Sequence, residues 1–515
     1  MKKTLLGLTT VLAMTVANGQ TTFQKTYGGL ASDWGRSVCP TNDGGYALCG
    51  NSLSFVTGFD DVYVIKTDSN GDTLWTRNYG LSGVDVGYSI KQTFDNGFII
   101  AGSQGYGGFN AYLLKLDSIG NILWSSTANN MNRYYSVEVT DDGNYVTIGY
   151  GGGSNSNIFL SKIDMNGNLL WSKSYGSIYE DVGYSVKQTY DKGYILAGYT
   201  FGYGAGQYDG YLIKTDSVGN IIWTKTYGNT LNDYFFSVQQ TADSGFIACG
   251  GYDSPISLLS DGYAYLVKTD INGDTLWTKT FNTQGGNAYD VKQTSDFGYI
   301  VTGTGNQTGN VHLVKLNSMG DIVWYKNFGG NGSDRGYNVW QTNDEGFIIA
   351  GETESFGAGN IDYYLIKTDS LGNTGGCNEY INSVVAPNPI SFINTGGTVG
   401  TGITLNNLTS SINTPPTIVN NLCFSTSISQ IQKATSPMNI FPNPFSEQTT
   451  LQIDSFLHNA TLSVDNCFGQ TVKQIKNISG QTVILTRDNL PSGLYFIRLT
   501  ENNNVLATSK LVIAD

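Results

Sequence analysis

A pattern of apolar and polar positions recurs seven times along the chain. Its clearest copy is Lys214-Thr-Asp-Ser-Val-Gly-Asn-Ile-Ile-Trp223, and successive copies start 47 to 54 residues apart. A short apolar run precedes each copy and an alternating run follows it, which predicts two strands joined by a tight loop with Gly in the left-handed conformation. The copies begin at Lys66, Lys115, Lys162, Lys214, Lys268, Lys315 and Lys367.

A second repeated pattern lies between these copies and predicts another hairpin. It runs from Gly183 to Gly198, with an Asp-x-Gly turn between two apolar runs. Each unit therefore holds four strands, and four-stranded units with a period near fifty residues are typical of a β-propeller. The second hairpins centre on Tyr46, Phe98, Tyr145, Tyr194, Phe246, Tyr299 and Phe347, so we predict seven blades.

The two ends of the repeat region are complementary. Thr22–Gly28 matches the fourth strand of a blade, with Phe23 at the position of the repeated Trp. The seventh copy has Gly376 where that Trp should be, so the last blade lacks its own outer strand. Pairing the N-terminal strand with this blade would close the ring and remove an exposed sheet edge.

Composition and charge limit the possible functions. With 515 residues the chain should hold more than one domain. The net charge of −13, with no basic stripe, argues against a nucleic-acid partner. Residues 1–19 have Lys2 and Lys3 before an apolar run and small residues, which predicts a secretory signal peptide that leaves Gln20 first. No other apolar run is long enough to predict a transmembrane segment.

The repeat stops after residue 376, and two further regions follow. Residues 377–436 are a connecting segment rich in Asn, Thr and Pro, where an oxidising compartment permits a disulfide between Cys377 and Cys423. Residues 437–515 show six short alternating runs, typical of a small immunoglobulin-like β-sandwich. The predicted organisation is a signal peptide (1–19), a seven-bladed β-propeller (20–376), the connecting segment (377–436) and this all-β domain (437–515).

Motifs in the last domain resemble a known export signal. Ile440-Phe-Pro-Asn-Pro-Phe445, Leu490-Pro-Ser-Gly-Leu-Tyr495 and Lys510-Leu-Val-Ile513 are similar to the type A C-terminal sorting domain of the type IX secretion system of Bacteroidetes. The resemblance implies Sec export to the periplasm, transfer across the outer membrane by the type IX machinery, and then release or attachment to the outer cell surface. Its motif residues here are Pro442, Asn443, Pro444, Gly493, Tyr495 and Lys510.

The repeated turn invites metal and cofactor interpretations, which the residues do not favour. Asp68, Asn70 and Asp72 alternate as in a calcium loop, but no carboxylate follows to complete six to eight ligands. The gap between Asp and Gly differs from that of the sialidase Asp-box. The turn also resembles the tryptophan-docking motif of quinoprotein dehydrogenases, but a shared packing device does not imply their cofactor. We therefore expect no metal and no cofactor, and we expect the repeated Trp to pack between neighbouring blades.

A ligand site should lie where the blades differ from one another. The irregular loops between strands two and three, and between consecutive blades, open on one face, here called the loop face. These loops carry aromatic residues beside polar ones, a combination that suits sugar rings or peptide segments, although the same residues could simply pack their own loops. The candidates are Phe55, Phe59, Tyr106, Phe109, Phe201, Tyr203, Tyr208, Tyr252 and Phe356.

One position of the innermost strand also varies from blade to blade. We expect it to border the central channel of the ring. Its residues are Cys39, Lys91, Glu138, Lys187, Gln239, Lys292 and Trp340.

Catalytic residues are scarce. The chain has two histidines, His312 and His458, so neither a histidine metal site nor a Ser-His pair is favoured. The leading hypothesis is a secreted or cell-surface, non-enzymatic propeller that binds an extracellular glycan or protein. The alternatives are a structural matrix protein, or a propeller-type glycoside hydrolase or polysaccharide lyase. The enzyme would use loop-face carboxylates, for which the candidates are Asp33, Asp85, Glu180, Asp181, Asp233 and Asp334.

Overall fold

The chain divides into two compact units, Met1–Ser427 and Ile428–Asp515. The computed structural model describes residues 20–514 apart from 57, 81–82, 106–109, 129, 154–155, 254–261, 282–285, 306–308, 376–378, 381–391, 395–397, 402–404, 409–410, 414–417, 427–437, 467–470 and 502–503. The predicted signal peptide, Tyr106, Phe109 and Cys377 lie outside these residues. None of the described residues lies in a helix long and apolar enough to span a membrane.

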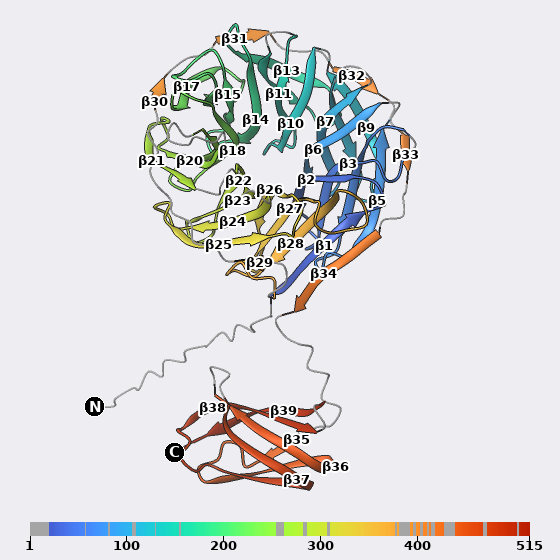
Figure 1. Ribbon diagram of the computed structural model, residues 1–515, viewed down its shortest axis with the longest axis vertical. Coiled ribbons are helices and arrows are strands. Elements are labelled where there is room, and N and C mark those ends of the chain that lie inside the picture. The colour runs from blue at the N-terminus through green and yellow to red at the C-terminus, as the bar shows by residue number, and fades with distance from the viewer. Residues whose placement is uncertain are drawn as a thin grey trace, which may run out of the picture. The chain divides into compact units, whose positions relative to one another are not determined.

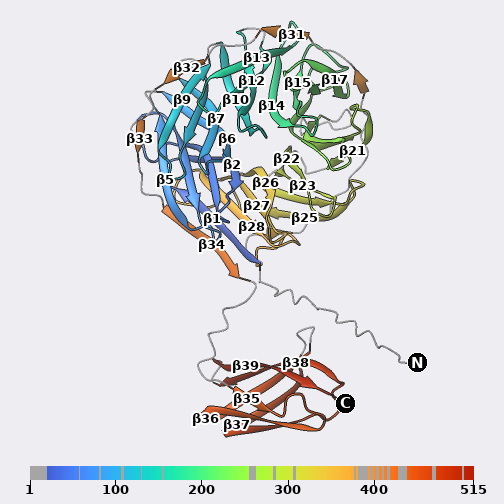
Figure 2. The same ribbon diagram turned by 180° about the vertical axis from the view of Figure 1, so that it is seen from behind.

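The first unit is a ring of seven antiparallel blades around a central axis, which confirms the predicted propeller (Figures 1 and 2). In each blade the first strand faces the axis and the fourth lies at the rim. Blade 1 is β2 (Asp33–Pro40), β3 (Tyr46–Ser52), β4 (Asp61–Thr67) and β5 (Thr73–Gly80). Blade 2 is β6 (Val84–Gln92), β7 (Phe98–Gly105), β8 (Asn110–Leu116) and β9 (Ile122–Ala128). Blade 3 is β10 (Met131–Val139), β11 (Tyr145–Gly151), β12 (Asn157–Ile163) and β13 (Leu169–Gly176).

The remaining blades repeat the same order of strands. Blade 4 is β14 (Asp181–Gln188), β15 (Tyr194–Thr200), β16 (Asp209–Thr215) and β17 (Ile221–Gly228). Blade 5 is β18 (Asp233–Gln240), β19 (Phe246–Tyr252), β20 (Tyr263–Thr269) and β21 (Thr275–Phe281). Blade 6 is β22 (Ala288–Gln293), β23 (Tyr299–Gly305), β24 (Asn310–Leu316) and β25 (Ile322–Phe328). Blade 7 is β26 (Asp334–Gln341), β27 (Phe347–Thr353), β28 (Asp362–Thr368) and β1 (Thr21–Gly28).

The N-terminal strand closes the ring as the sequence predicts. β1 runs antiparallel to β28, with Phe23 opposite Lys367 and Tyr27 opposite Tyr363. The repeated Trp packs on the next blade, as Trp75 does on Phe98 with ring centroids 6.0 Å apart. Phe23 makes the equivalent contact with Tyr46 of blade 1. The seam is therefore built like the other blade interfaces.

The repeated Lys ties together the two turns of its own blade on the face opposite the loop face, here called the turn face. In all seven blades its Nζ lies 2.6 to 2.8 Å from the Asp of the first hairpin turn, as in the pair Lys214 and Asp191. The stem of Lys214 is buried, and Nζ also donates to the carbonyl of Thr215. The repeated charge is thus used inside each blade.

Residues after the seventh blade return around the rim and form what we call the belt, strands β29 to β34. Each belt strand adds to the outer strand of one blade, and the order of the blades runs backwards along the chain (Figures 1 and 2). The longest, β34, pairs with β1 from Thr21 to Gly28. The belt consists of β29 (Glu379–Tyr380) on β25, β30 (Phe392–Asn394) on β17, β31 (Thr398–Thr401) on β13, β32 (Leu405–Leu408) on β9, β33 (Ser411–Asn413) on β5, and β34 (Ile418–Thr426) on β1.

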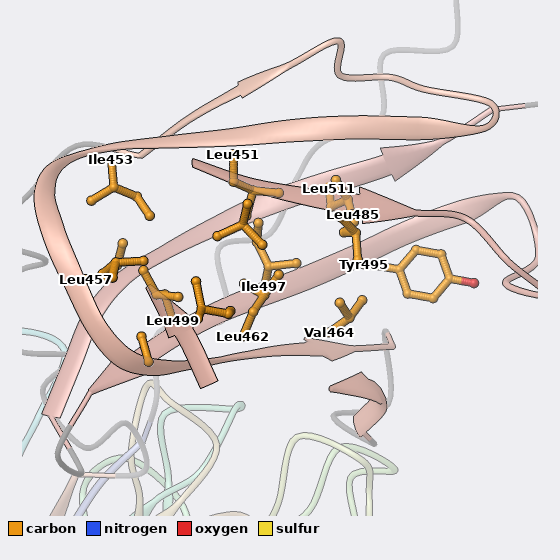
Figure 3. Close-up of a cluster of buried hydrophobic side chains, with 14 of the residues drawn as sticks. Leu451, Ile453, Leu457, Leu462, Val464, Leu485, Tyr495, Ile497, Leu499 and Leu511 are labelled. Atoms are coloured by element: carbon orange, nitrogen blue, oxygen red, sulfur yellow. The ribbon is translucent and has the colours of Figure 1, made fainter. Parts of the chain in front are cut away.

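The second unit is all-β with one apolar core and has the predicted sandwich form (Figure 3). The first part of β36 pairs with β35 and its last part with β38, while β37 follows β36 along both parts. Leu451, Leu462 and Ile497 are buried in the core between them. Its strands are β35 (Met438–Phe441), β36 (Gln448–Asp465), β37 (Thr471–Thr486), β38 (Gly493–Glu501) and β39 (Asn504–Ile513).

The prediction of six short strands in this unit is wrong, because the unit has five strands in the described residues. The four runs expected between residues 449 and 485 merge into the long hairpin β36–β37. Asn459 and Asn477 adopt positive φ angles of 61° and 56° near shifts of register, and Asn tolerates this conformation. The polar residues that suggested turns therefore bend the strands without ending them.

Candidate functional site

Seven side chains, one from each blade, form a closed ring around the axis near the loop face, here called the axial ring. Neighbouring aromatic rings have centroids 4.6 to 5.4 Å apart, from Tyr88 round to Tyr337. Arg36 closes the circle, with its guanidinium carbon 5.5 Å from the ring centre of Tyr337 and 5.8 Å from that of Tyr88. The members are Arg36, Tyr88, Tyr135, Tyr184, Phe236, Tyr289 and Tyr337.

A β-bulge in every innermost strand explains why these side chains converge. In blade 4 the register with β15 shifts between Gly183 and Ser185, so Tyr184 is the extra residue. The same shift occurs around the ring member of each other blade. A bulge bends the strand and re-aims the side chain of its extra residue. The extra residue of each bulge, aromatic in six of the seven blades, therefore points its side chain toward the axis.

Five further aromatic residues extend from the axial ring over the loops of blades 4 and 5, and we call them the aromatic platform. Tyr199 contacts Tyr208 and Tyr234, with centroids 5.1 and 5.2 Å apart. Phe201 lies 5.2 Å from Tyr208 and 5.5 Å from Tyr179. Tyr179 is 50% exposed and Phe201 39% exposed, so the platform reaches solvent. Its members are Tyr179, Tyr199, Phe201, Tyr208 and Tyr234.

The platform is continuous with the axial ring. Tyr199 contacts Tyr184, with centroids 6.0 Å apart, and Tyr234 lies nearly parallel to Phe236 at 6.3 Å. The hydroxyl of Tyr199 donates to Oε1 of the exposed Glu180 at 2.5 Å. The loop face therefore offers one connected apolar surface with a carboxylate at its edge.

Below the axial ring lies a cavity of about 110 Å³, which we call the axial cavity. A layer of small polar side chains, including Ser89 and Ser185, lines its wall. Lys91, Lys187 and Lys292 line it as well, so this part of the variable position does border the channel as expected. Lys91 lies over Trp340 of the same position, with Nζ 4.3 Å from the ring centre.

The loop aromatics proposed from sequence occupy three kinds of position. Four of them pack on a tyrosine in the third strand of their own blade, with centroids 5.2 to 6.1 Å apart. Phe201 and Tyr208 belong to the platform, and Phe59 is 47% exposed on blade 1. Tyr106 and Phe109 lie outside the described residues. The four packed pairs are Phe55 with Tyr63, Tyr203 with Tyr211, Tyr252 with Tyr265, and Phe356 with Tyr364.

The carboxylates at the start of the innermost strands hold the preceding loops. Oδ2 of Asp33 accepts hydrogen bonds from the Gly29 amide at 2.8 Å and the Ser54 hydroxyl at 2.5 Å. Asp181, Asp233 and Asp334 each accept the amide four residues earlier, at 2.6 to 3.0 Å. They are buried, as is Asp85 at the same position of blade 2. Burial raises the pKa of Asp233 to about 8.

The axial ring was not predicted from the sequence, whereas the variable position that holds the three lysines was expected to border the channel. The signal available was the spacing itself, because one residue per blade at a fixed place in the first strand must converge on the axis. Among the described residues, no group of three or more His, Cys, Asp or Glu side chains could hold a metal ion.

The motif residues of the second unit join its first segment to its last strand. The Asn443 side-chain amide donates to the Lys510 carbonyl at 2.9 Å and accepts from the Val512 amide at 2.8 Å. The Pro442 carbonyl accepts the hydroxyl of Thr449 at 2.6 Å. Tyr495, which follows Gly493 in β38, donates to the carbonyl of Pro491 at 2.8 Å.

Residues 439–514 match the family described as the secretion system C-terminal sorting domain, which confirms the resemblance. No curated protein matches the chain. Three similar solved structures have TM-scores of 0.38 to 0.41. A protein of unknown function from Bacteroides caccae is 13% identical (TM-score 0.38), covering 55% of this chain and 93% of its own. Sqt1 from Chaetomium thermophilum is 11% identical (TM-score 0.41), covering 63% and 81%. PorZ, a surface component of the type IX secretion system of Porphyromonas gingivalis, is 9% identical (TM-score 0.40), covering 94% and 59%.

The sorting domain marks the chain for type IX export to the cell surface or the extracellular space, and implies contact with the secretion machinery.

Proposed function

We propose that this exported β-propeller binds an extracellular glycan, or a segment of an extracellular protein, through its loop face without converting it. The aromatic platform carries the proposal. Its five rings form a connected set of contacts, and they remain partly exposed to solvent instead of being buried in the core. A monomeric soluble protein seldom exposes a large contiguous apolar patch unless the patch binds a ligand or a partner.

The chemistry of the platform suits a sugar ring better than a purely apolar ligand. A sugar has an apolar face that stacks on an aromatic side chain and hydroxyls that need polar partners. Phe201 and Tyr179 supply exposed ring surface, while Glu180 supplies a carboxylate beside Tyr199. A glycan is therefore the favoured ligand, and a protein segment is the second outcome of the test.

The loop-face carboxylates support binding over hydrolysis. A glycosidase needs two carboxyl groups that reach the scissile bond. Asp33, Asp181, Asp233 and Asp334 are buried and accept loop amides, so they are occupied in holding the loops. Glu180 is exposed and remains the one loop-face candidate of the six that a substrate could reach directly. These positions favour a binding protein, with the enzyme and a matrix protein as alternatives.

The export route is part of the proposal. Residues 1–19 would direct the chain through the Sec system into the periplasm, and the type IX machinery would then engage residues 437–515. Removal of the sorting domain would leave the propeller released or attached at the outer surface.

A glycan and polysaccharide array probed with residues 20–515 tests the ligand class, and calorimetry then measures each hit. Changing Tyr179, Phe201 and Tyr208 together to Ala should weaken binding at least tenfold, because each stacked ring contributes on the order of 1 kcal/mol. The melting temperature should change little, since these side chains lie in loops. Phe59, exposed on blade 1, is the next position to test.

The matched control is Tyr190→Ala. Tyr190 belongs to the same blade and is 65% exposed, but it lies in the hairpin turn on the opposite face. Equal loss of affinity in this variant would contradict a loop-face site. Reducing ends released from a bound polysaccharide would establish the enzyme, and no binding across the array would favour a protein partner or a matrix role.

A further inference from the structure

Three lysines from alternate blades meet at the axial cavity. Lys91 is in blade 2, Lys187 in blade 4 and Lys292 in blade 6, and all three line the same cavity. Glu138 lies between two of them, with its Oε2 2.5 Å from Lys187 Nζ and 3.8 Å from Lys91 Nζ. One carboxylate therefore serves two ammonium groups.

Asp290, the one carboxylate among the described residues that line the cavity, is already occupied. Its Oδ1 accepts the Ser237 hydroxyl at 2.6 Å and is paired with Lys292. Its Oδ2 accepts the side-chain amide of Asn338 at 2.6 Å and the Val339 amide at 3.1 Å. Both oxygens are therefore engaged in holding blades 5, 6 and 7 together.

The site holds more positive than negative charge. Lys91, Lys187 and Lys292 give three cations, while Glu138 and Asp290, which pair with them, give two anions, so the difference is one positive charge. The chain as a whole has a net charge of −13. Buried charge without a partner is costly, so a surplus of this kind in a cavity indicates a missing anion.

Three donors in the site have no acceptor among the described residues. Arg36 Nε is buried and has no hydrogen-bond partner among the described residues. Ser89 and Ser185 each accept a backbone amide of the next blade, at 3.3 and 3.4 Å, and their hydroxyls still have a proton to donate. Burial and the charge of Lys187 lower the pKa of Lys91 to about 8, which fits a shortage of negative charge around it.

We propose that the axial cavity binds one oxyanionic group, a carboxylate, sulfate or phosphate, held by Lys91, Lys187 and Lys292 with the serine layer as additional donors. Three ammonium groups that line one cavity can supply the charge-assisted hydrogen bonds that such groups accept. A cavity needs a volume of about 15 Å³ to hold one water molecule. The axial cavity, at about 110 Å³, can therefore hold a small polyatomic anion. This site goes beyond the glycan platform, and either can exist without the other.

Calorimetry on residues 20–515 tests the proposal with sodium sulfate, inorganic phosphate and glucuronate, with glucose as the neutral comparison, at one ionic strength set by sodium chloride. We expect one binding site for at least one oxyanion and none for glucose. Binding of sulfate or phosphate would identify a free ion, and binding of glucuronate alone would identify an acidic sugar. Absence of binding for all three oxyanions would overturn the proposal.

The variant Lys91→Gln removes one cation and keeps most of the side-chain length. It should weaken oxyanion binding at least tenfold, whereas the control Lys192→Gln should leave it unchanged, because Lys192 is 62% exposed at a turn. Equal oxyanion affinities in the two variants would overturn the site, because Lys91 would then contribute no more than a surface charge does.

A pH series on the unaltered chain gives a readout that does not depend on how the variant folds. The charged and titratable groups around Lys91 are Lys187, Glu138, Lys292 and Cys39. Sulfate keeps its charge from pH 6.5 to 9.5, while Lys91 loses its proton as the pH rises through about 8. Sulfate affinity should therefore fall across this range, and a flat profile would contradict the role of Lys91.

Discussion

The ring of Phe23 meets the ring of Tyr46 edge-on, with their centroids 6.4 Å apart and their planes at 64°. Phe23 belongs to the strand that completes blade 7, and Tyr46 to the second strand of blade 1. The same kind of contact joins Trp223 to Phe246 between blades 4 and 5, at 5.8 Å. The seam between chain ends is thus held by the contact that holds the covalently continuous blades.

Phe23→Ala should open this seam. Phe23 is fully buried, and truncating a buried Phe to Ala costs about 3–5 kcal/mol of unfolding free energy. The midpoint of a urea titration should therefore fall, and aggregation should rise as strand edges are exposed. Leu30→Ala is the control, because Leu30 is 81% exposed just beyond the same strand. Equal midpoints for the two variants would mean that the contact does not hold the ring closed.

The belt should stabilise the ring separately from the sorting domain. A chain ending at residue 427 keeps β34, which pairs with β1 over its whole length, whereas a chain ending at 376 loses all six belt strands. The shorter chain should melt at a lower temperature and aggregate more, because the outer strands become exposed edges. The chain ending at 427 is the control for losing the sorting domain. Coincident melting curves would show that the belt contributes nothing to stability.

Buried carboxylates at the loop face should make stability fall as the pH rises. Burial, together with the charge of Asp209, raises the pKa of Asp233 from its usual 3.8 to about 8. The unfolded chain releases this proton near pH 4 and the folded chain near pH 8, so the stability from Asp233 is full below pH 4 and is lost as the pH approaches 8.

Asp233→Asn should therefore reduce the loss of melting temperature between pH 5 and pH 9. The amide oxygen can still accept the Asn229 amide, so the loop keeps its anchor. Asp181→Asn is the matched control, because the neighbour of Asp181 beside Gly176 is the neutral Asn157. Asp181→Asn should reduce the loss of melting temperature less than Asp233→Asn does. The opposite order would contradict the role of the Asp209 charge near Asp233.

The second unit should direct export without the propeller. It has its own core, and Asn443 joins its first segment to its last strand. Residues 428–515 fused to a periplasmic reporter should carry the reporter out of the cell, as measured by fractionation. Leu462→Asp places a charge in the core and should abolish the transfer. A fusion that stays in the periplasm would contradict an autonomous sorting signal.

The blades and the closure could be predicted because both depend on local repetition. Each copy of the Lys214–Trp223 pattern encodes a hairpin turn and a Trp that packs on the next blade. The number of copies therefore gives the number of blades. Phe23 could be assigned because it stands at a repeated position. The belt could not be predicted, since strands of two to four residues such as Glu379–Tyr380 have too few positions to show any alternation.

The candidate site was harder for a different reason. Tyr184 and its equivalents stand at one place in every repeat, but the sequence does not show the β-bulge that turns their side chains toward the axis. The position of Lys91, Lys187 and Lys292 was expected to border the channel, but sequence does not show which of its seven residues line one cavity. Loop aromatics such as Tyr252 and Phe356 could not be separated from exposed ones such as Phe201, because sequence does not show which tyrosine a loop side chain meets.

The position of β1 between β28 and β34 also sets an order in time. β1 leaves the ribosome before either partner, and its pairing waits for residues 362–368 and then for residues 418–426. Contacts of such long sequence separation form slowly. Until they form, a strand that ends up in the interior of a sheet is an open edge that any passing chain can join. The sheet edges of β1 are therefore covered only when β34, the last strand of the first unit, is in place.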